Sequence, residues 1–412
     1  MESKRIMRQL VRWRRSLHQC PEIGYEERKT ARFVIGELQR LGIPYEYGGV
    51  GGGIVARLRG VRAEGPRVAL RAELDALPIA EQTGLPFASR HRGKMHACGH
   101  DGHMAMVLGA AALLQDSLPQ GDVVLIFQPA EEGGLGAQVM IDAGALAGVA
   151  MIFGGHLTNL YPTGQIMAVP GPVCAQADSF RIRVFGRGGH GARPHEATDA
   201  LVASAALVGG LQTLVSREAN PLDPSVVTIG TLQAGTARNV IAHEALLEGT
   251  IRTTQSGTRL RLIAGMERMC RALGEAYHTR IELELSEPYP PVINTPRETE
   301  LARRAAARVV GAGRVLSYEL PSMGAEDFSL YLNEVPGCFV RFGARAPNAA
   351  NVPLHSPQFD FDEAALLVGA RYFEAVVRLA LAEDLSATQV LPDDPTLVGT
   401  STARAICCGS EG

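Results

Sequence analysis

Apolar and polar positions follow two different patterns in this chain. Up to about residue 177, short continuous apolar runs alternate with segments of helical periodicity, such as 5–19, 26–41 and 104–114. Continuous apolar runs are typical of strands buried on both faces. The predicted buried strands are 67–71, 122–127 and 150–153. Because ionisable residues follow each of them, this part predicts an α/β fold with a crevice at the carboxyl ends of the strands.

The pattern changes near Asp178. Residues 179–185 alternate apolar and polar positions, which predicts a strand with one face in water. The elements that follow are a helix at 198–217, strands at 225–232 and 245–254, a helix at 260–277 and a strand at 280–285. This order of strand, helix, two strands, helix and strand predicts a split βαβ sandwich, a ferredoxin-like α+β unit inserted into the chain.

The remaining residues return to the first pattern. Helical periodicity at 297–310 and 362–382 surrounds an apolar strand at 338–342. We therefore expect one α/β domain in two parts, with the insertion between them and a polar, disordered tail at the end. The predicted boundaries are 1–177 and 290–383 for the two parts, 178–289 for the insertion and 384–412 for the tail.

Composition narrows the classes of protein. A chain of 412 residues is longer than one hydrophobic core normally supports, which agrees with two domains. The net charge of −3 gives no electrostatic case for binding nucleic acid or an anionic membrane. We see no apolar stretch of about 18 residues and no secretory signal, so we expect no membrane span. Seven scattered cysteines suit the reducing cytoplasm.

The segment Met95–His103 is the strongest chemical signal. Its nine residues hold three histidines, a cysteine and an aspartate. A single His or Cys is usually only packed, but so many polar groups would cost several kcal/mol on burial unless they were paired or bound a metal. Cys98 and His100 are two apart, so they do not share a helix face and belong to a turn that enters a helix. Without a second Cys-x-x-Cys half, a structural zinc knuckle is disfavoured.

Further ionisable residues follow the predicted strands. Alone, Glu73 and Asp75 would be turn or capping acids, and Glu131 and Glu132 an exposed acidic turn. Together with the first segment, these acids indicate a metal site. Its candidate ligands number five, which is more than one four-coordinate ion needs and therefore suits two cations. The candidate ligands are Cys98, His100, Glu132, His156 and His355. These donors suit Zn²⁺ or Mn²⁺, with Co²⁺ or Ni²⁺ as further options. Glu131 would take a proton from a water activated by the cations, which is metal-assisted amide hydrolysis.

Motifs along nearly the whole chain resemble the aminoacylase and carboxypeptidase family of dinuclear metallopeptidases. The nearest branch is that of N-acyl amino acid amidohydrolases, hippurate hydrolases and indole-acetyl-amino acid hydrolases. The matching segments are 17–22, 70–78, 96–103, 128–132, 189–195, 238–241, 324–328 and 355–357. The resemblance implies a catalytic domain with a mixed sheet flanked by helices and an inserted dimerisation, or lid, domain. It also implies a homodimer or a dimer-based tetramer.

The resemblance also implies roles for single residues. The five candidate ligands match the family's dimetal ligands, and Glu131 matches the general base. His190 matches a residue that reaches the neighbouring subunit's active site to stabilise the oxyanion, and Asn239 and Arg252 match residues that hold the substrate carboxylate. Arg252 could also be a surface strand charge.

Three acids are expected to support the ligands: Glu73, Asp75 and Asp101. Asp101 would orient a neighbour or cap the following helix. Glu73 stands where the family usually has Asp, and Arg71 stands where dizinc relatives carry a ligand histidine.

We therefore expect a metallo-amidohydrolase that cleaves N-acetyl, benzoyl or related N-acyl amino acids to a carboxylate and a free amino acid. A dipeptidase or an aminobenzoyl-glutamate hydrolase could use the same machinery. A non-catalytic metal-binding protein is a further alternative, although a structural metal site does not need a proton shuttle such as Glu131. The sequence leaves the preferred acyl group, the preferred amino acid and the native metal open.

Overall fold

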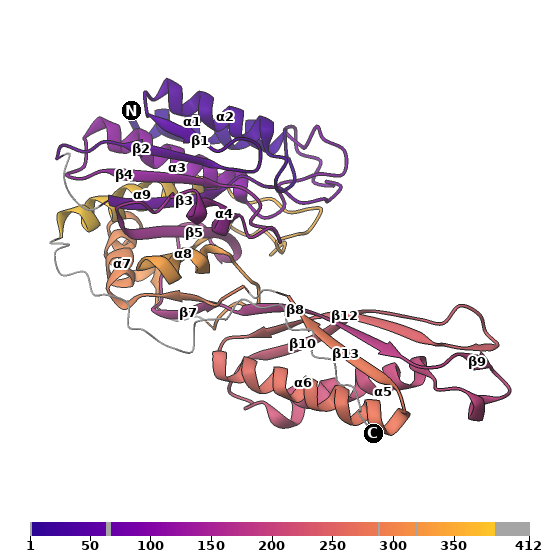
Figure 1. The fold of residues 1–412 in the computed structure, drawn as a ribbon. Coiled ribbons are helices and arrows are strands. Elements are labelled where there is room, and N and C mark those ends of the chain that lie inside the picture. The colour runs from indigo at the N-terminus through magenta and orange to yellow at the C-terminus, as the bar shows by residue number, and fades with distance from the viewer. Residues whose placement is uncertain (1, 63–66, 287–288, 318–319, 384–412) are drawn as a thin grey trace. The chain divides into compact units, whose positions relative to one another are not determined.

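The computed structural model describes residues 2–62, 67–286, 289–317 and 320–383 (Figure 1). These residues form two compact units. One unit comprises the described residues of 1–173, 292–320 and 327–383, and the other comprises those of 174–291 and 321–326. The predicted disordered tail at 384–412 lies outside the described residues.

A mixed eight-stranded sheet runs through the first unit. In order across the sheet, its strands are β1 (Tyr45–Tyr47), β2 (Ile54–Leu58), β4 (Val123–Gln128), β3 (Arg67–Glu73), β5 (Val149–Pro162), β16 (Gly337–Arg345), β6 (Ile166–Met167) and β15 (Val315–Leu316). The four central strands, β4, β3, β5 and β16, are parallel to one another. The strands β7 (Gly171–Cys174) and β14 (Val292–Asn294) form a separate pair. The parallel centre explains the continuous apolar runs, since its residues are buried on both faces.

Helices pack on both faces of this sheet (Figure 1). Four of them contact one another in sequence on one face: α1 (Glu2–His18), α3 (His100–Asp116), α9 (Ala364–Ala382) and α7 (Pro296–Val310). The short helices α4 (Gly136–Asp142) and α8 (Phe328–Glu334) contact each other and the sheet, and α2 (Arg28–Arg40) contacts α3 and β2. Two residues of β5 that are three positions apart face opposite sides of the sheet: Leu157 lies against Gly102 of α3, whereas Gly154 lies against Phe328 of α8. A short 3-10 helix, η3 (Ala312–Arg314), follows α7.

Several elements differ from the sequence prediction. The strand predicted at 150–153 continues to Pro162, because β16 pairs with it in parallel from Ile152 onward, and His156 therefore lies inside β5 rather than after it. The helix predicted from 104 already begins at His100.

The second unit is a four-stranded antiparallel sheet with two helices. Its elements are β8 (Gln176–Phe185), α5 (Ala200–Thr213), β10 (Ser225–Ala234), β12 (Glu244–Thr253), α6 (Ser256–Tyr277) and β13 (Arg280–Leu285). The strand order β10-β12-β8-β13 is that of a ferredoxin-like fold. A small ribbon is formed by β9 (Gly189–His190) and β11 (Val240–Ile241), and the short helical turns η1 (Pro194–Glu196) and η2 (Leu214–Glu218) complete the unit.

One helical stretch among the described residues, Ala200–Glu218, is long and apolar enough to cross a membrane by length and composition alone. We expected no apolar stretch of about 18 residues, and this stretch differs from that expectation. Leu207 and Leu211 of the same stretch are buried in the core of the second unit. A single stretch of this kind is weak evidence for a span, because core helices meet the same criteria.

Candidate active site

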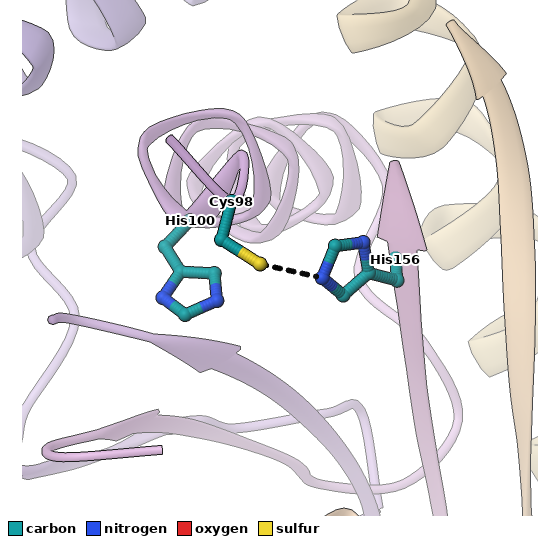
Figure 2. Close-up of side chains that lie close together, drawn as sticks. All are labelled: Cys98, His100 and His156. Atoms are coloured by element: carbon teal, nitrogen blue, oxygen red, sulfur yellow. Dashed lines mark hydrogen bonds between the residues drawn. The ribbon is translucent and has the colours of Figure 1, made fainter. Parts of the chain in front are cut away.

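The turn into α3 places Cys98 and His100 beside His156. Gly99 is the residue before the helix, and its φ of 90° is a left-handed conformation that suits glycine. This turn directs the Cys98 side chain toward β5, where its Sγ lies 3.3 Å from the His156 Nε2, whereas the His100 side chain points in another direction (Figure 2). The ligand atoms of these three buried residues lie within 4.8 Å of one another.

Glu132 and His355 join the same group from two other segments. Their ligand atoms lie within 4.8 Å of each other and of the Cys98 sulfur. The His355 Nε2 is 3.0 Å from the Glu132 Oε1. The His355 backbone N–H donates to the Ala97 carbonyl at 2.8 Å, which ties the loop that carries this histidine to the turn that carries Cys98. The structure thus brings all five predicted ligands together in the first unit.

These residues fit divalent cations. The His100 Nε2 is buried and has no hydrogen-bond partner among the described residues. Buried polar atoms are costly without a partner, and the convergence of sulfur, nitrogen and oxygen donors suits a borderline cation. Cys98 belongs to two of the ligand groups, one with His100 and His156 and one with Glu132 and His355. The residues of these two groups would hold two neighbouring divalent cations.

Backbone and carboxylate contacts fix the orientation of the imidazole rings. The His156 Nδ1 lies 2.7 Å from the Leu157 carbonyl, so it donates there and leaves Nε2 facing Cys98. The His100 Nδ1 lies 2.9 Å from the Asp75 carbonyl and 3.2 Å from its Oδ1. The Asp75 Oδ2 also accepts the Glu132 backbone N–H at 2.9 Å. Asp75 therefore contacts two candidate ligands at once.

Glu73 supports the site through His103, a residue to which the sequence analysis gave no role. The Glu73 Oε2 lies 2.8 Å from the His103 Nδ1, and the His103 Nε2 accepts the Leu157 backbone N–H at 2.9 Å. Because both ring nitrogens are used, His103 donates to Glu73 and is not free to bind a cation. The chain of contacts continues to His156 through the two polar groups of Leu157.

A buried arginine of β3 links the ends of β3 and β4 to the start of α8. Arg71 donates to Glu73, to the Gln128 Oε1 at 2.8 Å and to the Asp327 Oδ1 at 2.7 Å. The Asp327 Oδ2 also accepts the Ala137 N–H at 3.0 Å. No role was expected from the sequence for Gln128 or Asp327, although both lie in segments that carry the family resemblance, 128–132 and 324–328. Gln128 is the last residue of β4, and Asp327 directly precedes α8.

Asp101 connects α3 to α1 instead of capping α3. It is the second residue of the helix, after Gly99 as N-cap and His100. Its Oδ2 accepts from the Arg14 Nε at 3.0 Å and lies 2.8 Å from the His18 Nδ1. The side chain thus orients two residues of the N-terminal helix.

Protonation in this cluster depends strongly on burial. Burial, with the nearby Glu132 charge, raises the pKa of Cys98 well above its ordinary value. Burial opposes the protonation of His100, but the hydrogen bond and the charge of Asp75 outweigh it and raise the pKa of His100 to about 10. Burial, with nearby His103, lowers the pKa of His156. Cations that enter the site must therefore displace the protons of Cys98 and His100.

Glu131 lies next to the cluster. Its side chain is mostly buried, and the Oε2 is 3.9 Å from the His100 Nε2. Glu131, Glu132 and His100 form a further group with ligand atoms within 4.8 Å of one another. A carboxylate in this position can accept a proton close to the cation ligands.

The remaining candidates belong to the second unit. His190 is exposed in β9 and pairs with Val240 of β11, and the Asn239 carbonyl accepts the Gly191 N–H at 2.8 Å, so His190 and Asn239 lie on one ribbon. The His190 Nδ1 accepts the Ala192 N–H at 3.1 Å, which leaves the Nε2 of a neutral ring as a donor. Arg252 lies in β12, half-buried, and burial lowers its pKa.

A family model described as peptidase family M20/M25/M40 matches residues 69–379. The chain belongs to this family. An N-acetylcysteine deacetylase of Bacillus subtilis is 38% identical over 92% of this chain and 99% of its own length. Thermostable carboxypeptidase 1 of Saccharolobus solfataricus is 38% identical over 88% of this chain and 92% of its own.

A solved structure extends the similarity to the fold. The YXEP protein of Bacillus subtilis, described as a dinuclear metal-binding peptidase of the M20 family, has a TM-score of 0.80 at 36% identity and covers 92% of this chain and 99% of its own. The protein is therefore a metallohydrolase of amide bonds with a site for two divalent cations, as the sequence resemblance implied.

Proposed function

We propose that the protein hydrolyses N-acyl amino acids to a carboxylate and a free amino acid, with Glu131 as the general base. The observation that carries this proposal is the position of Glu131 at the edge of a cluster of five candidate ligands. Those ligands are Cys98, His100, Glu132, His156 and His355. The deacetylase relative supports an acyl amino acid as substrate.

The residues divide the chemistry among them. When bound, two cations would polarise the amide carbonyl and make water more acidic. Glu131 accepts the proton of the attacking water and then delivers it to the leaving nitrogen, which lets the amine depart in neutral form. Asp75 contacts His100 and the Glu132 backbone, and these contacts fix the positions of the ligands relative to the base. Glu73 and Asp101 support the site from further away, Glu73 through His103 and Asp101 through residues of α1.

Three residues of the second unit would recognise the substrate. We assign the oxyanion to His190, because the hydrogen bond from Ala192 to Nδ1 leaves Nε2 as a donor. Asn239 and Arg252 would bind the substrate carboxylate, since amide and guanidinium groups donate to carboxylates. In this proposal His190 acts on the neighbouring subunit of a homodimer or of a dimer-based tetramer. A monomer with full activity would contradict that role.

The donor set supports Mn²⁺ or Zn²⁺ as the native cation, with Co²⁺ or Ni²⁺ as alternatives. We propose a cytoplasmic location, because seven scattered cysteines, an odd number, suit a reducing compartment better than a disulfide framework. Neither nucleic acid nor a membrane is proposed as a partner, since the net charge is only −3.

A peptide substrate is the second candidate, because one relative is named a carboxypeptidase. A dipeptidase or an aminobenzoyl-glutamate hydrolase would use the same cluster. A non-catalytic metal-binding protein would not need Glu131 as a proton acceptor. A panel of acetyl, benzoyl, long-chain and indole-acetyl amino acids, compared with dipeptides that carry a free amino group, separates these alternatives.

The base is tested with two neighbouring substitutions. Glu131→Gln should abolish turnover and keep both cations, because only the proton acceptor is lost. Glu132→Gln should lower the metal content, because it removes a ligand. Turnover and metal per subunit are measured on the same preparations. Activity retained in Glu131→Gln would refute the assignment of the base, and inactivity of the metal-loaded parental protein across the panel would refute the proposed function.

A further inference from the structure

The turn that carries Glu131 has an unusual backbone. Ala130, directly before the base, has a φ of 46°, and Leu135 has a φ of 55°. Residues other than glycine rarely adopt this left-handed region, and they remain there only when their surroundings hold them. The direction in which Glu131 leaves the backbone therefore depends on what fixes Ala130.

A carboxylate holds the backbone on each side of Glu131. On one side, the Asp75 Oδ2 accepts the Glu132 N–H at 2.9 Å. On the other side, the Glu27 Oε1 accepts the Ala130 N–H at 2.8 Å. Glu27 is distant in sequence and was not singled out there. Its side chain is only 3% exposed.

The Glu27 side chain does not cap the helix that follows it. It stands at the N-cap of α2 but makes no side-chain capping bond. Its Oε2 is buried and has no hydrogen-bond partner among the described residues. Burial raises the pKa of this carboxyl to about 7. Because a buried, half-satisfied carboxyl is unfavourable for folding, a purely structural role would be served better by an apolar side chain.

The segment before Glu27 is packed tightly against the same turn. A Cβ on Gly24 would lie 2.9 Å from the Ala130 Cβ, too close for any other residue. The Tyr25 hydroxyl donates to the Gly134 carbonyl. The Glu22 carbonyl accepts the Ala76 N–H at 2.8 Å, next to Asp75. The segment thus spans the two points at which carboxylates hold the turn.

We infer that Glu27 is a positioning residue for the general base, because its carboxyl oxygen fixes the Ala130 peptide and with it the backbone of Glu131. The inference rests on the proposed function only in taking Glu131 as the base. Glu27 itself is assigned no contact with substrate or cations.

Two substitutions of similar volume test this role. Glu27→Gln keeps an oxygen that can accept the Ala130 N–H, whereas Glu27→Met fills the space without that oxygen. We expect Glu27→Met to lower kcat about 10- to 100-fold with KM and metal content unchanged, and Glu27→Gln to stay within about 3-fold of the parental kcat. Glu37→Ala is the control, because it removes another buried glutamate of α2 that pairs with Arg40. This control should affect stability and leave the kcat of the folded protein unchanged.

Three outcomes would overturn the inference. They are an unchanged kcat in Glu27→Met, equal losses in Glu27→Met and Glu27→Gln, and loss of metal from Glu27→Met. Should Glu27→Met fail to fold, residue-resolved amide exchange of the parental protein decides. The Ala130 amide should then be strongly protected, and exchange as fast as that of an exposed loop amide would refute the hydrogen bond. Since exchange needs no substrate, it still tests Glu27 if the parental protein hydrolyses nothing and the proposed function fails.

Discussion

Replacement of His18 by glutamine should make the stability of the first unit less dependent on pH. His18 is fully buried, with its Nδ1 2.8 Å from Asp101 and its Nε2 3.3 Å from Glu81. Burial opposes protonation, but these two carboxylates outweigh it and raise the pKa of His18 to about 9. The ring is therefore charged in the folded protein at neutral pH, between two acids.

The pKa shift sets both the sign and the size of the effect. A histidine whose pKa rises from an ordinary value of about 6.5 to about 9 on folding stabilises the folded state fully below about pH 6.5 and loses that contribution as the pH rises through about 9. This rise in pKa corresponds to about 3 kcal/mol of stabilisation of the folded state. His18→Gln should thus cost about 3 kcal/mol more at pH 6 than at pH 9.5.

Trp13 provides the assay. It is the only tryptophan of the chain, and it lies buried in α1 together with His18. Its fluorescence therefore follows the unfolding of this unit in urea. Chelator-treated parental and variant proteins are compared at both pH values, so that other titrating groups cancel in the difference.

His195→Gln is the matched control, because His195 is exposed and belongs to the other unit. It should leave the Trp13 transition unchanged at both pH values. If His18→Gln costs the same at pH 6 and pH 9.5, His18 is not charged in the folded protein and the reasoning from its two carboxylates is wrong.

Three further predictions concern the metal site. The apoprotein should bind Zn²⁺ more tightly at pH 8 than at pH 6, as measured by titration calorimetry. The reason is that burial raises the pKa of Cys98, and the thiol must lose its proton to bind the cation. Equal affinities would contradict cysteine ligation. Asp75→Asn should lower metal retention on dialysis about 10- to 100-fold, because it weakens the support of His100; unchanged retention would remove Asp75 from the site. Gly136→Ala should abolish activity, since its Cβ would overlap the Pro129 carbonyl oxygen; an active, normally folded variant would refute that packing.

The parallel core of the first unit could be predicted because each of its strands has a recognisable local sequence pattern. Each is a short apolar run, and the residues after β3 and β4 meet at one edge of the sheet. The short strands β1, β6 and β15 have no such pattern, because two or three residues show no periodicity. The extension of β5 past His156 depends on pairing with β16, far along the chain.

The candidate ligands could be named from residue type and position, and the structure brings them together, but their roles as ligands stay predictions. The contacts that orient them could not be predicted. His103 acts through the backbone of Leu157, and Glu27 acts through the backbone of Ala130. Backbone groups carry no sequence signature, so such contacts emerge only from the fold.

The order of the ligands along the chain has a consequence for folding. Cys98, Glu132 and His156 precede the inserted unit, whereas His355 follows it and is held by its backbone to Ala97. Bound cations would thus act as a staple that closes a long loop with the whole insertion inside it, much as a disulfide does. Removal of the staple should loosen the return of the chain at His355 first. The insertion, with its own hydrophobic core, could fold before the staple closes.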